Sequence, residues 1–467
     1  MSRISLTLFF VLTLVCVHGQ IFPVDTLLKT GDIRRRINLV FLSDGYQAHE
    51  MNTYITDVNR LLTDMFSQVP FKHYRNYFNA FAIKVPSNQS GAKHPRTSSD
   101  SDCAPVPQQD VDNYFGSTFD YGNIHRLLVP TKAGTIAVTL ANNFPLFDQA
   151  FVLVNSPFYG GSGGSVAASS THSNANEVSI HEIGHSFAGL ADEYWAGSAY
   201  AFERPNLTQQ NNPSLVKWAS WVGHAGVGVY PHAEASNWFR PHQNCKMRYL
   251  NVPFCDVCNE TFVERIHTLV NPIDEYSPRL PVVALANEPL QFSVNYIKPE
   301  PNTMSVIWKK DGAVLATNQD AVTVPVASFT TAQAIITATL TDNTALSRSA
   351  THTTSHAYVI EWTVTAEAPV TGVKVQTELL KYEVSVFPNP VVKDLQLSYV
   401  LPRDARVKVV LEDLSGRQLT SLLDEQQGPG SHSVSVDVSD ILKSSGVYVL
   451  AFQFDELVTF KRIIKPD

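Results

Sequence analysis

Hydrophobic and polar positions follow two different periods in the first part of the chain. Residues 37–42 and 147–155 are short, mostly apolar runs, and such runs predict buried strands. Between residues 49 and 66, and again between 178 and 190, apolar positions recur at the spacing of a helix that buries one face. This mixture of strand and helix patterns over residues 20–272 predicts an α/β (α+β) domain.

After residue 272 the pattern changes to short runs, rich in Val and Thr, in which apolar and polar residues alternate. Alternation of this kind is typical of strands with one buried face. Residues 280–366 contain the hairpin-type dipeptide Asp311-Gly312 after one such run, and they predict an immunoglobulin-like β-sandwich without the cysteine pair of antibody domains. Residues 382–467 repeat the pattern and predict a second all-β sandwich domain.

The N-terminus has the order of features found in a secretory signal peptide. Arg3 supplies a positive charge, residues 6–17 are apolar, and residues 17–19 carry small or modest side chains at the expected cleavage point. We therefore expect residues 1–19 to be removed on export. No other run is long and apolar enough to span a bilayer, which predicts a mature chain without an integral membrane span.

The overall charge of the chain argues against nucleic acid as its main partner. The chain of 467 residues has a formal net charge of −8, and its basic residues form no stripe along a helix or strand pattern. Nucleic-acid binding domains carry such a stripe as their electrostatic footprint. Nucleic acid is therefore excluded as the main partner.

The expected export of the chain determines how its cysteines are interpreted. Cys16 leaves with the signal peptide, and Cys103, Cys245, Cys255 and Cys258 remain. An even number of cysteines in an exported chain favours disulfides. The Cys-x-x-Cys run at 255–258 also resembles half of a zinc knuckle or a redox pair, but a four-thiolate zinc site would need the two distant cysteines. We therefore expect disulfides, with a pairing that the sequence does not give.

The strongest chemical motif is His-Glu-x-x-His at residues 181–185. On a helix, His181 and His185 lie one turn apart, so both imidazoles project from one face onto a metal ion. Zinc accepts neutral imidazole nitrogens, and Glu182 beside it can take a proton from water and pass it to a leaving amine. The simpler interpretation is a pair of surface histidines on a helix. The motif predicts one catalytic zinc ion with Glu182 as general base.

The third zinc ligand is expected just after the helix. In the metzincin pattern a glycine stops the helix and a third ligand returns to the metal, and here Gly189 is followed by two carboxylates. We expect Asp192 to be the ligand, with Glu193 as the alternative. A thermolysin-like site would instead take a later glutamate, for which Glu203 and Glu234 are the candidates.

A methionine and a tyrosine further along support the metzincin interpretation. Metzincins carry a methionine in a tight turn beneath the metal, and some have a tyrosine two residues later. Met247 and Tyr249 match that spacing. Tyr249 is then expected to stabilise the oxyanion or to act as a loose extra ligand. The alternative is that Met247 fills the core and Tyr249 has no role in catalysis.

A glycine-rich loop precedes the motif helix. Residues 159–164 follow the second apolar strand, and this position predicts the upper rim of a substrate groove. A substrate peptide would then add to the neighbouring edge strand. A plain flexible linker is the alternative.

The motifs together resemble those of the bacterial IgA metallopeptidase family. HEIGHSFAGLADEY at 181–194 is similar to the signature HExGHxxxGLxDEY, and residues 38–46, 79–91 and 245–258 resemble further segments of that family in the same order. The resemblance implies a zincin-type catalytic domain, a zinc cofactor and endopeptidase activity on a protein or peptide substrate. It also implies that His181 and His185 are ligands and that Glu182 is the base.

The last segment has a resemblance of its own. Residues 386–390, 395–397, 413–416 and 446–448 are similar to motifs of the C-terminal sorting domain of the type IX secretion system. This implies that the type IX secretion machinery is a partner. It also implies export through the periplasm to the medium or the cell surface.

Two other functions are compatible with these motifs. A cell-surface binding protein would use the sandwiches and keep zinc only as a structural ion, and an amidase would cleave peptidoglycan crosslinks. The intact Glu182 favours catalysis, because a structural site closed by protein ligands has no use for a base. The sequence predicts a secreted zinc metalloendopeptidase and leaves its substrate open.

Overall fold

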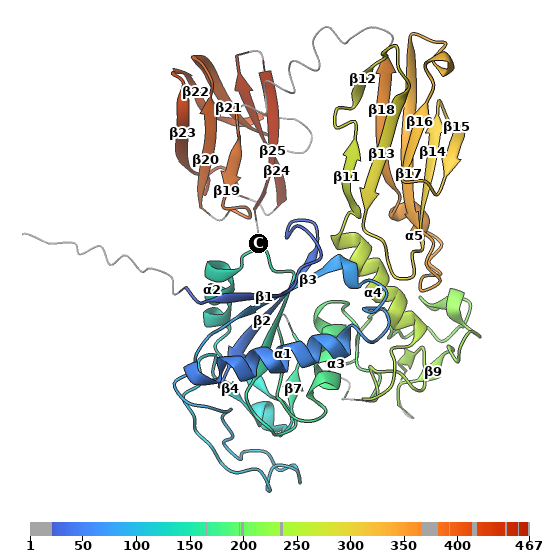
Figure 1. The fold of residues 1–467 in the computed structure, drawn as a ribbon. Helices are drawn as coiled ribbons and strands as arrows, with labels where there is room; N and C mark the ends of the chain where they lie inside the picture. The colour runs from blue at the N-terminus through green and yellow to red at the C-terminus, as the bar shows by residue number, and fades with distance from the viewer. Residues whose placement is uncertain are drawn as a thin grey trace, which may run out of the picture.

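The computed structural model describes residues 21–164, 166–195, 197, 200–233, 237–365, 382–391, 393–412, 418–443, 446–455 and 457–465. The expected signal peptide, Glu234 and the motif at 413–416 lie outside these residues. A mixed α/β region is followed by β-rich regions (Figure 1). The predicted class, α/β followed by all-β segments, is confirmed at this level.

A six-stranded mixed sheet forms the centre of the N-terminal region, with strand order β1-β3-β2-β6-β8-β7. The four central strands β3, β2, β6 and β8 run parallel, and β1 and β7 pair antiparallel at the two edges. The predicted runs at 37–42 and 147–155 are confirmed as β2 and β6. The strands are β1 (Val24–Leu28), β2 (Ile37–Asp44), β3 (Phe78–Ile83), β6 (Gln149–Val154), β7 (Gly161–Ser162) and β8 (Ala167–Ser169).

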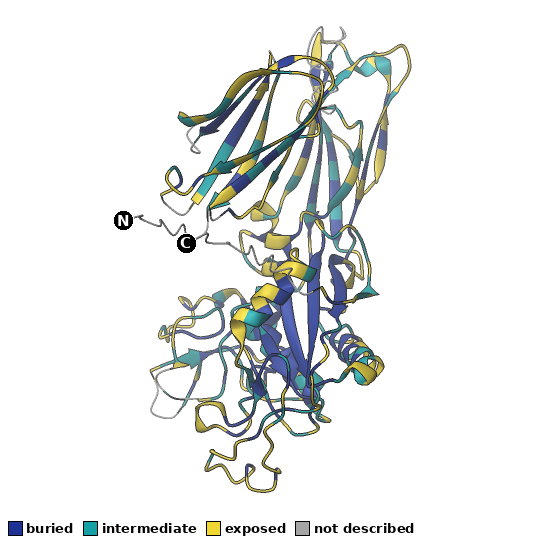
Figure 2. Cartoon of the chain, turned by 90° about the vertical axis from the view of Figure 1, so that its left-hand side faces the viewer, coloured by how far each residue is buried: buried dark blue, intermediate teal, exposed yellow. Residues whose placement is uncertain are grey.

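Both faces of this sheet are covered, so its central strands are buried from end to end (Figure 2). Leu39 and Phe41 point to a core shared with α1 and α3, whereas Val40 and Leu42 point to a core shared with α2. This alternation follows from the two-residue period of a strand. The helices are α1 (Met51–Met65), α2 (Ala133–Asn143), α3 (Ala175–Ser186) and α4 (Asp256–Leu269).

A turn at the end of β2 joins separate segments of this region. Asp44 is fully buried, and its carboxylate accepts hydrogen bonds from the backbone amides of Gly45, Phe115 and Ser117 at 2.9–3.1 Å. Gly45 has φ of 68°, and a Cβ there would lie 2.2 Å from the carbonyl oxygen of Gly91. Glycine is therefore needed after Asp44, because any larger residue would collide with the backbone at Gly91.

The long connections carry only short elements. These are η1 (Ala48–Glu50), η2 (Arg75–Tyr77), β4 (Ser117–Thr118), η3 (Tyr121–Asn123), β5 (Val129–Pro130), η5 (Ala219–Trp221), β9 (Tyr230–Pro231) and β10 (Phe239–Arg240).

The segment after α4 is a two-sheet sandwich with orders β11-β13-β16 and β12-β18-β17-β14-β15. Trp308 and Trp362 stack in its core at 5.9 Å, and Asp311-Gly312 forms the expected hairpin turn between β14 and β15. The sandwich starts at Ile273, before the expected boundary of 280, because β11 pairs with β13. Its elements are β11 (Ile273–Ser277), β12 (Val282–Ala284), β13 (Leu290–Tyr296), β14 (Met304–Lys310), β15 (Ala313–Thr317), β16 (Ala321–Val324), η6 (Val326–Ser328), β17 (Gln333–Asp342), α5 (His352–Ser355) and β18 (Tyr358–Thr365).

Buried polar contacts join this sandwich to the N-terminal region. Asp342 at the end of β17 is fully buried and accepts hydrogen bonds from Tyr74 at 2.6 Å and from His267 at 2.9 Å. Glu264 on α4 bonds His352 at 2.6 Å and His356 at 2.9 Å. The two regions are therefore connected by satisfied polar pairs as well as by α4.

The last region also consists of two sheets, with orders β19-β20-β23 and β22-β21-β24-β25. Alternate residues of these strands fill one apolar core that includes Leu397, Val409 and Phe452. The strands are β19 (Ser385–Phe387), β20 (Asp394–Leu401), β21 (Ala405–Glu412), β22 (Gln418–Gln427), β23 (Gly430–Asp437), β24 (Gly446–Phe454) and β25 (Leu457–Lys465).

Candidate metal centre

Helix α3 places His181 and His185 on one face and then stops abruptly. The amide of Gly189 donates to the carbonyl of His185 at 3.1 Å, and that of Leu190 donates to the carbonyl of Gly184 at 2.9 Å. The first of these bonds is that of the αL capping motif, which requires the left-handed backbone that Gly189 adopts with φ of 67°. The predicted glycine stop is confirmed, and the chain turns back over the histidines.

Asp192 completes a cluster with the two histidines. Its Oδ1 lies 3.0 Å from Nε2 of His181 and 3.2 Å from Nε2 of His185, and the two Nε2 atoms are 3.2 Å apart. Zinc with ligand distances of 2.0–2.1 Å would hold tetrahedral ligands about 3.3–3.4 Å apart. The three atoms therefore already have nearly the mutual spacing of a zinc site.

The outer nitrogens of both rings are held by backbone carbonyls. Nδ1 of His181 bonds the carbonyl of Lys246 at 2.9 Å, and Nδ1 of His185 bonds the carbonyl of Leu190 at 2.8 Å. Each Nδ1 must donate to a carbonyl, so each neutral ring directs an Nε2 lone pair at the cluster. This donor set fits a zinc ion.

Glu193 faces away from this cluster, although it follows Asp192 directly. It is fully buried, and its Oε1 accepts a hydrogen bond from Asn206 and lies 3.5 Å from the sulfur of Cys258. The structure thus brings Asp192 to the histidines and Glu193 to the cysteines. Glu203 instead pairs with Lys217 at the surface.

Glu182 lies at the edge of the cluster under the glycine-rich loop. A Cβ on Gly163 would lie 2.6 Å from Oε2 of Glu182 and 3.2 Å from Cβ of His185. Burial raises the pKa of Glu182, and the opposing effect of His181 and His185 does not cancel that rise. A carboxyl group whose pKa lies above its ordinary value is suited to proton transfer near neutral pH.

Electrostatic coupling is strong within the cluster. Burial alone would lower the pKa of His185, but its hydrogen bond to Asp192 and the charge of that carboxylate raise it to about 9. Burial opposes ionisation of Asp192, yet hydrogen bonds from the two histidines hold its pKa well below its ordinary value. A proton and a metal cation therefore compete for the same lone pairs.

Met247 lies beneath the motif helix, as expected from the sequence. It is fully buried, and a Cβ on Gly184 would lie 2.6 Å from its sulfur. Tyr249 is 47% exposed, and the Arg248 guanidinium lies 4.7 Å from its ring centre. None of the hydrogen bonds among the described residues joins Tyr249 to the cluster, so its catalytic role stays a prediction.

Three residues near the cluster were not identified from the sequence as site residues. The ring of Tyr194 stacks on that of His181 with centres 6.5 Å apart, and the guanidinium of Arg126 lies 5.8 Å from the Tyr194 ring. Nε2 of His232 bonds the carbonyl of Asp192 at 2.9 Å. Tyr194 belongs to the signature itself, whereas no local pattern marks Arg126.

The rim of the site differs in part from the expected free edge strand. Residues 161–162 form the edge strand β7, but the amide of Gly161 donates to the carbonyl of Arg126, and its carbonyl accepts from Leu128. Ser162 also donates to the Leu128 carbonyl at 2.6 Å. An added peptide strand cannot use these groups, which restricts any strand addition to the backbone after Ser162.

The expected disulfides are absent, because all four cysteines described by the structure are free. Cys103 lies among His94, Asp120 and His125, far in sequence from the other thiols. The other cysteines converge on one buried point with sulfurs 3.6–3.7 Å apart, so they do not form pairs. The disulfide prediction is wrong in this structure, since tertiary contacts group the thiols differently.

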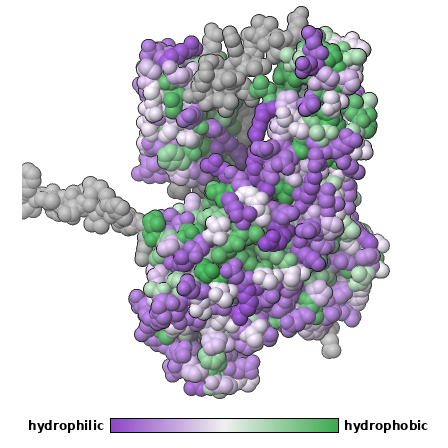
Figure 3. Space-filling view, in the orientation of Figure 1, coloured by the Kyte–Doolittle hydropathy of each residue, from purple (hydrophilic) through white to green (hydrophobic). Residues whose placement is uncertain are grey.

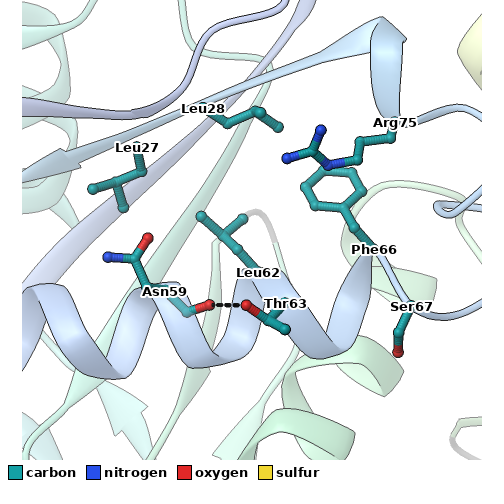
Figure 4. Close-up of a pocket in the computed structure, with 8 residues that line it drawn as sticks. All are labelled: Leu27, Leu28, Asn59, Leu62, Thr63, Phe66, Ser67 and Arg75. Atoms are coloured by element: carbon teal, nitrogen blue, oxygen red, sulfur yellow. Dashed lines mark hydrogen bonds between the residues drawn. The ribbon is translucent and has the colours of Figure 1, made fainter.

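A hollow elsewhere on the surface offers no comparable chemistry. Between β1 and α1 a cavity of about 330 Å³ is lined by both apolar and polar side chains, with Arg75 over the ring of Phe66 (Figure 4). The surface there is hydrophobic in part (Figure 3). The lining holds neither a carboxylate nor a histidine, so the metal centre is the better candidate for a reaction site.

Comparisons with known families match two parts of the chain. Residues 26–232 match the family described as IgA Peptidase M64, and residues 385–466 match the Secretion system C-terminal sorting domain. No curated protein sequence matches the chain. Among the described residues, no helix combines the length and the apolar composition that crossing a bilayer requires.

Solved structures share only small parts with this chain. Latent PorU from Porphyromonas gingivalis is 14% identical with a TM-score of 0.18, over 44% of this chain and 21% of that protein. For β-glucuronidase 3 of Bacteroides uniformis the identity is 11% and the TM-score 0.17, over 47% of this chain and 28% of that protein. The chain thus spans less than a third of either protein, and such TM-scores carry no information on its fold.

Proposed function

Because residues 26–232 match the IgA Peptidase M64 family and residues 385–466 match a type IX sorting domain, we propose that the protein is an exported zinc-dependent endopeptidase. In this proposal His181, His185 and Asp192 hold one zinc ion in a zincin-type site. Glu182 is the general base and acid.

One observation carries the proposal: two Nε2 atoms and one carboxylate oxygen converge within 3.0–3.2 Å, while both Nδ1 atoms are held by carbonyls. Three protein ligands leave a fourth position for water or substrate, as in catalytic rather than structural zinc sites. Glu182 follows His181 on the same helix, and no hydrogen bond or ion pair among the described residues engages its carboxylate.

The chemistry divides between the ion and the chain. A zinc ion bound here would polarise the scissile carbonyl and lower the pKa of water to near 7. Glu182 accepts the proton of the attacking water and returns it to the leaving amine. The raised pKa of Glu182 favours its protonated form, which returns the proton to the leaving amine. A neighbouring divalent cation would favour its ionised form, which accepts the proton from water.

Two tyrosines are candidates for stabilising the oxyanion. Tyr249 is the expectation from the metzincin spacing, and Tyr194 is the residue whose ring contacts His181. Burial and the Asp192 carboxylate raise the pKa of Tyr194, so its hydroxyl stays protonated as a hydrogen-bond donor. We assign the role to Tyr194 and treat Tyr249 as the alternative.

The sorting domain indicates the route of export. A type IX sorting domain indicates passage through that secretion system to the medium or the cell surface. The expected signal peptide would first deliver the chain to the periplasm. The substrate is then an extracellular protein or peptide.

The decisive experiment is Glu182→Gln measured together with zinc content. We expect the variant to keep its zinc and to lose at least a hundredfold in casein hydrolysis, because only the proton acceptor is removed. Glu203→Gln is the matched control, since Glu203 pairs with Lys217 at the surface. Chelation of the wild-type protein should abolish the same activity.

Other outcomes would point to other functions. Full activity in Glu182→Gln, or after chelation, would contradict the mechanism. Hydrolysis of peptidoglycan fragments without hydrolysis of proteins would indicate an amidase. A zinc site that admits no exchangeable water would indicate a binding protein with a structural ion.

A further inference from the structure

A second buried cluster begins at the residue after Asp192. Glu193 directs its carboxylate toward Cys245, Cys255 and Cys258, and one potential ligand atom from each of these residues lies within 4.8 Å of the others. Three of the side chains are fully buried, and Cys255 is 7% exposed. The cluster is therefore closed to solvent, unlike the half-open centre formed by the histidines.

The sulfur spacing fits a shared metal ion. Sγ of Cys258 lies 3.7 Å from Sγ of Cys245 and 3.6 Å from Sγ of Cys255, and 3.5 Å from Oε1 of Glu193. Tetrahedral thiolates bound to zinc at 2.3 Å lie about 3.8 Å apart. A disulfide needs about 2.05 Å between sulfurs and uses only two of them, so it would leave a buried thiol unpaired.

The remaining contacts suit anionic ligands around a cation. Cys255 and Cys258 lie at the start of α4, where the helix dipole stabilises thiolates. The amide of Cys255 points at the sulfur of Cys245 at 3.4 Å. Oε2 of Glu193 is buried without a hydrogen-bond partner, which is costly unless a cation lies beside it.

We propose that Cys245, Cys255, Cys258 and Glu193 bind a structural zinc ion. Soft thiolate ligands select zinc over the hard cations magnesium and calcium, and four protein ligands close the site as structural zinc requires. Binding releases the thiol protons and needs no oxidant. The proposal does not depend on peptidase activity.

This ion would connect both backbone segments that hold the histidine centre. Lys246, next to Cys245, supplies the carbonyl that orients His181, and the amide of Glu193 donates to the carbonyl of Met247 at 2.7 Å. Glu193 also follows Asp192 directly. The cysteine site would therefore help to position the Asp192 carboxylate and the turn at Met247 beneath helix α3.

A separate observation carries a second proposal in the long connection before α2. His94, Cys103, Asp120 and His125 are each at most 5% exposed, and their ligand atoms again lie within 4.8 Å of one another. Nε2 of His94 is 3.4 Å from the Cys103 sulfur and 3.2 Å from Oδ2 of Asp120, and Nδ1 of His125 is 2.8 Å from Oδ1.

We infer that these residues form a third zinc site, which links loops that contain little regular structure. Nδ1 of His94 bonds the carbonyl of Pro107 at 2.8 Å, so Nε2 of the neutral ring points a lone pair at the cluster. A metal-free arrangement would instead have the Cys103 thiol, 3.4 Å away, donate its proton to Nε2 of His94. That arrangement is the alternative outcome of the test.

The test is the zinc content of the purified full-length protein and of single-site variants. We expect three zinc ions per chain in the wild type. Cys258→Ser and His125→Ala should each lose one, and His185→Ala should lose one from the histidine centre. Glu203→Gln should keep all three. The same zinc content in Cys258→Ser as in the wild type would overturn the first proposal, and the same content in His125→Ala as in the wild type would overturn the second.

Two measurements on the wild-type protein remain informative if a variant fails to fold. Cobalt-grown protein should show thiolate-to-cobalt charge-transfer absorption stronger than the single thiolate of Cys103 can give, and the His–His–Asp centre produces none. Alkylation after denaturation with a chelator and no reductant should modify Cys245, Cys255 and Cys258. If two of these cysteines resist alkylation, and the intact mass is lower by the two hydrogens lost in a disulfide, the cysteine site is overturned. This result does not depend on the histidine centre.

Discussion

Gly163 leaves no room for a side chain against Glu182. We expect Gly163→Ala to lower kcat/KM by about tenfold to hundredfold, because the added Cβ would lie 2.6 Å from Oε2 and displace the base. Zinc content should stay normal. Gly134→Ala is the matched control, since nothing lies within 4 Å of a Cβ there. Equal activities of the two variants would show that the loop does not position Glu182.

Tyr194 and Tyr249 differ in where their rings lie, and single variants separate their roles. Tyr194→Phe should lower kcat/KM by about tenfold to a hundredfold through loss of one hydrogen-bond donor, with KM little changed. Tyr249→Phe should stay close to wild type, because its ring lies against Arg248 and is 47% exposed. The reverse result would assign the oxyanion to Tyr249, as the metzincin spacing suggests.

Strand β17 ends in the contact that joins the sandwich to the N-terminal region. Asp342→Ala should destabilise the protein by about 3–5 kcal/mol, because it leaves the buried polar groups of Tyr74 and His267 without their acceptor. Asp320→Ala removes an exposed pair with Lys298 and should cost less than about 1 kcal/mol. Urea unfolding of both variants measures the difference, and equal midpoints would show that the contact contributes nothing.

Helix α4 adds a pH-dependent contact to the same boundary. Burial acts to raise the pKa of Glu264, but hydrogen bonds from His352 and Ser347 outweigh it and lower the pKa to about 2. A carboxyl group with a depressed folded pKa stabilises the protein above its ordinary value of 4.5 and loses that contribution as the pH falls toward 2. For His352, whose pKa is raised, the contribution is present below 6.5 and is lost at higher pH.

The resulting prediction concerns acid unfolding of the chain. The wild type should lose up to about 3 kcal/mol from Glu264 between pH 4.5 and 2, whereas Glu264→Gln should be less stable at pH 5 and show a flatter dependence. Denaturant titrations across this range measure both slopes. Parallel curves would show that other carboxylates control acid unfolding.

At the level of the whole molecule, the three regions of the chain differ in what they contain. The N-terminal region holds the candidate metal centre, buried polar contacts join the first sandwich to it, and residues 385–466 match a sorting domain. The three proposed zinc sites all lie in the N-terminal region, where long connections carry few regular elements. Metal binding would stabilise connections that strand pairing leaves unsupported.

Local patterns were enough to predict much of this fold. The buried runs became β2 and β6, the helical spacing became α1 and α3, and the alternation after residue 272 became strands of two-sheet regions. Each of these depends on the period of side chains along one element. For the same reason the sequence placed His181, Glu182 and His185 together, because one helical turn separates the histidines.

Contacts between distant segments were decided only by the tertiary structure. Asp192 and Glu193 are adjacent carboxylates, and only the turn after Gly189 directs one to the histidines and the other to the cysteines. Arg126 comes from a loop that no motif marks and lies over the ring of Tyr194, next to the cluster. The cysteines converge rather than pair, because the start of α4 folds against the turn at Cys245. Such approaches depend on packing across the whole chain, which local periodicity does not encode.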